Sequence, residues 1–197
     1  MNRLAQDAVI VGLARRLREH GSWTGETHLQ KATYLLRELL KVPFEFDFIL
    51  YKHGPFSFGL RDELSTMHVD QLIDRETQSS GYGPRIVITE RGLEIEQRFQ
   101  RTMARYEERL EWIAARLGDR GAADLERLAI ALWVTRQMNR DASVQDRAGA
   151  IHELEPHFSL ETVEGPVEQV DRLIGEAPSV CTKLLDQSRY SNVQAPA

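Results

Sequence analysis

The residues best suited to metal binding or nucleophilic catalysis are six histidines and one cysteine, Cys181. Their spacing includes no His-x-x-x-His pair and no Cys/His cluster of the kind that holds zinc. The chain also lacks a glycine-rich phosphate loop and the sequence of a nucleophile elbow. We therefore expect no metal site, no cofactor and no catalytic residue, and a function that is not enzymatic.

A second set of residues with chemical potential is cationic and lies in the first half of the chain. These side chains could contact the phosphates of double-stranded DNA, although a solvated helix face would explain the same charges. The net charge is -5, and the acidic surplus lies in the second half, so DNA contact would need a local basic patch. The candidate DNA-binding residues are Lys31, Arg37, Arg61, Arg75 and Arg85.

A third set surrounds the Gly54-Pro55 pair in "YKHGPFSFGLRDEL", residues 51–64. Exposed polar and aromatic groups at such a corner could bind a partner protein. The alternative is that the glycine and proline serve only the backbone and that their neighbours are merely solvated. The candidate partner-binding residues are Tyr51, Lys52, His53 and Phe56.

Two amphipathic helices are expected before these residues. Apolar side chains recur at helical spacing over residues 3–20 and again over residues 27–41. Gly21 is suited to end the first helix, and Thr27 with Gln30 has the capping-box spacing that would begin the second.

The pattern then changes to an alternation of apolar and polar residues over 44–51. This alternation is typical of a strand with one buried face. Pro55 should end the strand, because it lacks a backbone donor, and Ser57 should cap a helix over residues 57–68. The sequence therefore predicts a corner at which a strand leads directly into a helix.

The stretch "LIDRETQSSGYGPRIVITERG", residues 72–92, predicts two short strands joined by a long turn. Thr89 is suited to cap the helix that follows. The order helix, helix, strand, helix, β-hairpin is that of a winged helix-turn-helix, in which residues 57–68 would form the recognition helix.

Three segments of this half carry a family resemblance: "LQKATYLL" (29–36), "FILYKHGPFSFGLRDEL" (48–64) and "VITERG" (87–92). Together they resemble the YwgA-type family of uncharacterised bacterial proteins and, more distantly, the Panacea antitoxin domain of the SocA-like family. The resemblance implies a compact helical and winged fold. For the Panacea relatives it also implies toxin neutralisation by direct protein contact.

Residues 89–117 predict a long helix with an apolar seam that repeats every three or four residues. Such a seam suits either packing within a small helical bundle or a homodimer interface. The seam residues are Phe99, Met103, Tyr106, Leu110, Ile113 and Leu117.

More helices are expected after the "GDRG" break at residues 118–121. Serine caps begin the segments "SVQDRAGAIHEL" and "SLETV", and Gly165-Pro166 predicts a kink or a break. The last several residues have little to bury, and we expect them to be disordered.

These patterns predict an α+β fold, mainly helical with a small β-hairpin, in three parts. Residues 1–98 would form a winged-helix-like domain, residues 99–176 a helical bundle joined by the long helix, and residues 177–197 a weakly structured tail. One cysteine and no apolar run long enough to span a membrane favour a cytoplasmic protein.

The function expected from these features is that of a winged-helix regulator associated with DNA, acting as a dimer through the seam. The alternative is an antitoxin-like or phage-defence adaptor that binds another protein. The acidic second half would suit a basic partner in that case. Winged helices serve both purposes, so the fold class alone does not choose between them.

Overall fold

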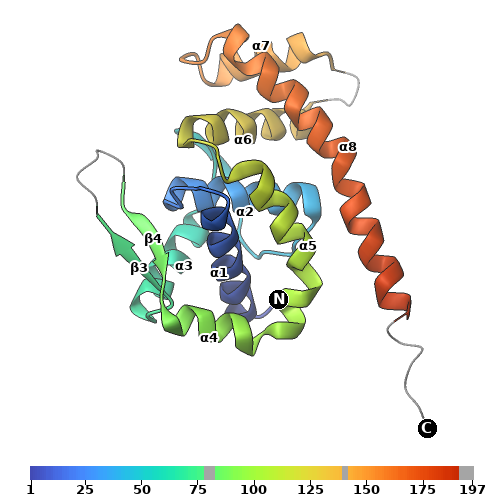
Figure 1. Ribbon diagram of the computed structural model, residues 1–197. Helices are drawn as coiled ribbons and strands as arrows, with labels where there is room; N and C mark the ends of the chain where they lie inside the picture. Colours follow the sequence, from blue (N-terminus) through green and yellow to red (C-terminus); the bar gives the residue numbers. More distant parts are fainter. Residues whose placement is uncertain (78–82, 139–141, 191–197) are drawn as a thin grey trace.

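A computed structural model describes residues 1–77, 83–138 and 142–190, with side chains described as far as residue 177. The fold is mainly helical with two short antiparallel hairpins, which confirms the α+β prediction (Figure 1). No helix within these ranges is long and apolar enough to cross a membrane. The elements are α1 (Arg3–Glu19), α2 (Glu26–Leu40), β1 (Ile49–Tyr51), β2 (Gly54–Phe56), α3 (Phe58–Val69), β3 (Ile73–Glu76), β4 (Arg85–Ile88), α4 (Glu90–Arg98), α5 (Gln100–Leu117), α6 (Ala122–Gln137), α7 (Val144–Leu154) and α8 (Leu160–Tyr190).

The predicted end of the first helix at Gly21 is confirmed. Gly21 has a φ of +94°, a conformation that favours glycine. Its N–H donates to the carbonyl of Arg18, and the N–H of Ser22 donates to the carbonyl of Leu17. This pair of hydrogen bonds closes α1 as a Schellman motif.

The predicted capping box at the start of α2 is wrong. Gly25 is the N-cap, no side chain of the described residues caps this end, and Thr27 lies inside the first turn. Gln30 is fully buried, and its amide accepts a hydrogen bond from the Ser57 N–H and donates one to the Ser57 carbonyl, both at 2.9 Å. Because unpaired buried backbone groups are costly, this long-range pairing outweighs a local cap. It joins α2 to the start of α3.

The first hairpin replaces the predicted strand-to-helix corner. Residues 44–48 alternate between buried and more exposed positions as predicted, but only β1 pairs with another strand, antiparallel to β2. Gly54 has a φ of +83° and allows the chain to reverse at Lys52 and His53. The chain therefore returns along β2, with Pro55 in that strand, before α3 begins.

The segments after this hairpin follow the predicted order. The Ser57 side chain caps α3 by accepting a hydrogen bond from the Leu60 N–H at 3.2 Å. β3 and β4 then pair antiparallel, as predicted for the second hairpin. Thr89 caps α4 by accepting a hydrogen bond from the Gly92 N–H at 3.0 Å.

The predicted seam lies inside the molecule. All of its residues belong to the hydrophobic core, Phe99 as a partly buried member, and Phe99 also divides the predicted long helix into α4 and α5. α5 packs on α1, where the Met103 side chain covers Gly12 so closely that a β-carbon there would collide with it. The seam is therefore occupied within the chain, and only Phe99 of the seam residues keeps some exposure for the homodimer predicted through it.

The hydrophobic core is continuous across residue 98, the boundary predicted between two domains. Buried residues of α1 and α2 belong to the same cluster as those of α5, α6 and α8. α1 packs directly against α5, and α2 against both α5 and α6. Figure 1 shows α1 at the centre, with α4, α5 and α6 around it and α7 at the far end beside α8.

α8 runs without interruption through Gly165-Pro166, so the helix does not break at this point, which was one of the two predicted outcomes. Val163, Val167 and Val170 are buried on both sides of the proline. Burial of this continuous apolar face outweighs the single hydrogen bond that the proline nitrogen cannot donate.

The other C-terminal predictions have mixed outcomes. Ser143 begins α7 as predicted and forms a capping box with Asp146. Residues 177–190 continue α8 as a helix within the segment predicted to be weakly structured. The prediction of disorder concerns residues 191–197, which lie outside the described residues.

Candidate functional site

Three aromatic side chains gather at the surface beside the turn of the first hairpin. The ring centroids of Tyr51, Phe56 and Phe58 lie 5.2 to 5.8 Å apart in each pair. Tyr51 is 43% exposed and Phe58 is 38% exposed. Ile49, the register partner of Phe56, is 47% exposed. These four residues are named the aromatic surface below.

Two cations lie over rings of the aromatic surface. The Arg61 guanidinium carbon is 4.9 Å from the centroid of Phe58, and the Lys52 ammonium is 5.9 Å from the centroid of Tyr51. Both distances are within the range of cation–π attraction. A carboxylate oxygen of Asp62 lies 3.4 Å from the Arg61 guanidinium and partly neutralises its positive charge. The aromatic surface therefore combines apolar area with positive charge at its edges.

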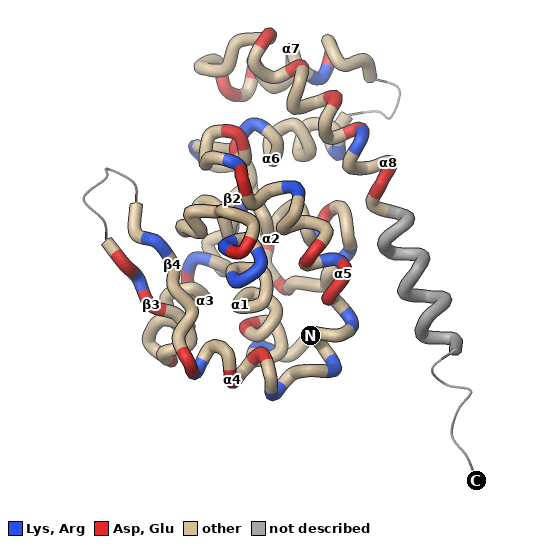
Figure 2. The backbone as a smooth tube through the Cα atoms, viewed as in Figure 1, with Lys and Arg blue, Asp and Glu red and all other residues tan. Residues whose placement is uncertain are grey.

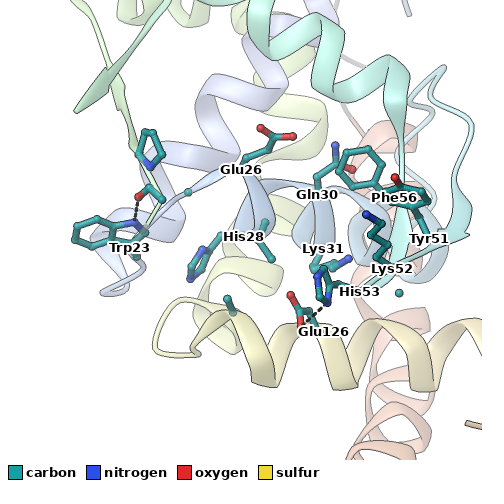
Figure 3. Close-up of a pocket in the computed structure, with 16 residues that line it drawn as sticks. Trp23, Glu26, His28, Gln30, Lys31, Tyr51, Lys52, His53, Phe56 and Glu126 are labelled. Atoms are coloured by element: carbon teal, nitrogen blue, oxygen red, sulfur yellow. Dashed lines mark hydrogen bonds and ion pairs between the residues drawn. The ribbon is translucent and has the colours of Figure 1, made fainter. Parts of the chain in front are cut away.

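A cavity of about 380 Å³ adjoins the aromatic surface, between the start of α2, the first hairpin and α6 (Figure 3). The structure brings the predicted partner-binding residues together, because all four line this cavity: Tyr51, Lys52, His53 and Phe56. Lys31 of the predicted DNA-binding set lines the same cavity.

Lys31 is not available to DNA, which corrects the prediction. The residue is 2% exposed, and its ammonium donates a hydrogen bond to the Pro55 carbonyl at 2.9 Å. Burial lowers the pKa of Lys31 to about 8, with the charge of Glu126 acting in the opposite direction. A buried amine cannot contact a phosphate backbone outside the fold, because the chain itself covers it.

Two histidines flank Lys31 in the cavity wall. Burial lowers the pKa of His28, and a hydrogen bond to the backbone of Arg120 opposes that shift. His53 Nδ1 lies 3.9 Å from a carboxylate oxygen of Glu126 on α6. Within the described ranges no group of three His, Cys, Asp or Glu residues could hold a metal ion. The arrangement is suited to binding charged and aromatic groups.

Two other candidate DNA-binding residues are engaged by the chain itself. Arg37 donates to the carbonyl of Phe46 at 2.6 Å, and Arg85 pairs with Glu76 at 2.5 Å. Figure 2 shows Lys and Arg interleaved with Asp and Glu along the elements it colours. Arg37 and Arg85 are therefore each held by a partner within the chain and do not form one basic patch with the rest of the predicted set.

The remaining two candidates, Arg61 and Arg75, are linked through Ser65 of α3, by the side chain of Arg75 and the backbone of Arg61. Arg75 of β3 donates to the Ser65 hydroxyl at 3.4 Å, and that hydroxyl donates to the carbonyl of Arg61 at 3.1 Å. Both arginines are exposed. Arg75 therefore reaches α3, whereas the Arg61 guanidinium lies over Phe58 and beside Asp62.

A buried carboxylate lies between α1 and α3. Asp7 is fully buried, and neither of its oxygens has a hydrogen-bond partner in the described part of the chain. Arg3 lies 3.9 Å from Asp7 and also binds Glu63 at 2.8 Å and Asp70 at 2.6 Å. Burial, followed by the negative charge of Glu63, raises the pKa of Asp7 to about 7.

The predicted site did not include Phe58, Gln30 or Glu126. Phe58 directly follows the cap residue Ser57. Its place in the first turn of the helix, close to the other aromatic residues in the sequence, could have indicated that it belongs to the site. Gln30 and Glu126 had no such signal, because they come from α2 and α6 and meet the hairpin only through tertiary packing.

A scan against protein-family models and a search of the curated proteins found no match for this chain. The resemblance to YwgA-type proteins and to the Panacea antitoxin domain therefore stays a prediction.

Proposed function

We propose that this protein is a non-enzymatic adaptor of the antitoxin-like or phage-defence kind that binds another protein through the aromatic surface. The carrying observation is the exposure of Ile49, Tyr51 and Phe58 on adjoining elements. Large apolar side chains that gather at a surface are typical of protein interaction sites, where aromatic residues are enriched. The resemblance to Panacea relatives, which act by direct protein contact, supports the same function.

The chemistry of the surface specifies the partner as an extended segment with apolar and acidic side chains. Lys52 and Arg61 at the edges of the aromatic surface favour carboxylates close to the apolar contact. β1 pairs with β2 along one edge, and no described strand pairs with its other edge. An extended segment can add to such an edge through main-chain hydrogen bonds.

Selection from a phage-displayed library of random peptides tests this function with purified protein. We expect enrichment of peptides that combine apolar and acidic residues, and at least about tenfold weaker binding to the Phe58→Asp variant, since apolar anchors dominate such contacts. Leu154→Asp is the matched control, because Leu154 of α7 is also a large exposed apolar residue, at 49%. Equal binding of the enriched peptides to wild type and Phe58→Asp would overturn the proposal.

DNA binding is the second candidate, and the exposure of Arg61 on α3 and Arg75 on β3 favours it. In a winged-helix arrangement α3 would be the recognition helix and the β3–β4 hairpin the wing. Ser65 and Thr66 on the exposed side of α3 add polar groups to this face.

Fluorescence anisotropy of random duplex DNA, at low and then physiological salt, tests the second candidate. Binding that falls steeply with salt, and less steeply in the Arg75→Glu variant, would support phosphate contact through this face. Absence of binding at low salt would exclude it and leave the protein partner as the proposed function.

A further inference from the structure

The ammonium group of Lys31 is buried with only part of its hydrogen-bonding capacity in use. Of its three N–H donors, one reaches the Pro55 carbonyl. No carboxylate in the described part of the chain forms an ion pair with it; Glu126 and Glu155 act on it only at longer range. A buried charge normally needs a close counter-ion to offset the loss of hydration. The open cavity beside Lys31 is where such a counter-ion could enter.

The cavity has the size and lining of a small-molecule site. Its volume of about 380 Å³ lies within the usual range for such sites, and its lining is mainly apolar. Trp23, Tyr51 and Phe56 supply aromatic walls, and Figure 3 shows His28 and Lys31 projecting from α2 toward α6. Aromatic walls favour a planar ligand body.

Other charges around the cavity favour an anion near Lys31. Lys52 lines the same cavity, and the uncapped start of α2 presents the positive end of a helix dipole there. The acids in the lining are Glu26 and Glu126, and Glu126 faces His53. Glu126 lies close to His53 and acts on Lys31 only at longer range, so no acid among the described residues forms an ion pair with Lys31.

We propose that this cavity binds a small organic anion, with a carboxylate or phosphate placed at Lys31 and a planar apolar body against Tyr51 and Phe56. The inference does not rest on the protein-binding function: Tyr51 and Phe56 belong to both sites, but Phe58, which tests protein binding, does not line the cavity among the residues described. A ligand here would contact the hairpin that carries the aromatic surface, and so could control access of a partner to it.

Titration of the ¹⁵N-labelled full chain with benzoate, phenyl phosphate and neutral benzamide tests the inference by NMR. We expect saturable shifts of the backbone amides of Glu26, Thr27 and Gly54 with at least one anion, and at least about tenfold weaker binding of benzamide, since the ion pair with Lys31 would be lost. No response to either anion, equal binding of benzamide, or shifts confined to other parts of the chain would each overturn it.

Variants separate the cavity from general attraction of anions. Lys31→Met should weaken anion binding by about tenfold or more, while Lys41→Met, which removes an exposed lysine at the other end of α2, should leave it unchanged. Should Lys31→Met fail to fold, Lys52→Met removes an exposed cavity cation and should weaken binding several-fold. Unchanged binding in a folded Lys31→Met variant, or in Lys52→Met, would overturn the site.

Discussion

The seam on α5 and the aromatic surface beside the first hairpin are both apolar, yet they lie in opposite environments. Leu110, Ile113 and Leu117 of the seam are fully buried against the rest of the chain, whereas Tyr51 and Phe58 remain substantially exposed. The apolar residues that repeat at helical spacing on α5 thus form a contact within the core, whereas the aromatic residues close to the hairpin turn form an exposed surface. Apolar character alone did not distinguish an interface with another molecule from an interface within the chain.

The largest expected effect is that of Leu110→Glu in the seam. Burying a carboxylate among apolar side chains should lower the free energy of unfolding by about 4 kcal/mol or more and unfold much of the protein. Circular dichroism and chemical denaturation measure this loss. Ala115→Glu is the matched control, because Ala115 is an exposed position of the same helix. A folded Leu110→Glu protein of half the wild-type mass by light scattering would restore the seam as a dimer interface.

Gln30→Ala should have the next largest effect, because Gln30 joins the core helix α2 to the base of the aromatic surface. The change leaves the buried Ser57 N–H without this partner, at about 1 to 3 kcal/mol, and costs the Ser57 carbonyl one of two hydrogen bonds, at about 1 kcal/mol, because the Arg61 N–H still donates to that carbonyl at 3.1 Å. We expect a loss of about 2 to 4 kcal/mol in urea denaturation. Gln97→Ala, at an exposed position of α4, is the control. A change no larger than that of the control would contradict the role given to Gln30.

Asp7→Asn tests the polar contact between α1, which covers the seam, and α3, which begins at the aromatic surface. The folded pKa of about 7 lies above the ordinary 3.8, so unfolding releases a proton between these values. The stability of the wild type should therefore fall as pH rises from about 4 to about 7.

Asp7→Asn should remove much of this fall and be more stable than wild type at pH 8 by about 2 to 4 kcal/mol, at about 1.4 kcal/mol per pKa unit. Urea denaturation across this pH range measures the difference. Asp119→Asn, at an exposed position, should follow the wild-type profile. Parallel profiles for wild type and Asp7→Asn would show that Asp7 is ionised in the fold.

Phe58→Asp should have the smallest effect on folding. The residue is exposed at the first position of α3, where an acidic side chain is favourable to the helix dipole. We expect a change in the free energy of unfolding of less than about 1 kcal/mol, measured by urea denaturation. A loss comparable to that of Leu110→Glu would place the aromatic surface in the core and end its comparison with the seam.

The sequence by itself determined several helix ends and much of the burial pattern. Gly21, Ser57, Thr89 and Ser143 each act at the ends where their residue types predict, because a cap depends on the few backbone groups next to it. The alternation over residues 44–48 and the seam spacing also predicted which side chains are buried, because the period of a strand or a helix sets the buried face.

Tertiary structure alone decided which distant parts of the chain contact the buried faces of the helices and the buried polar side chains. It turned the predicted corner into a hairpin, gave Gln30 the backbone of Ser57 in place of a local cap, and covered the seam with α1. It also removed Lys31 from the surface and placed it beside a cavity. Pairing of buried polar groups and closing of apolar faces involve residues far apart in the chain, and their free energies outweigh the local preferences that a sequence pattern records.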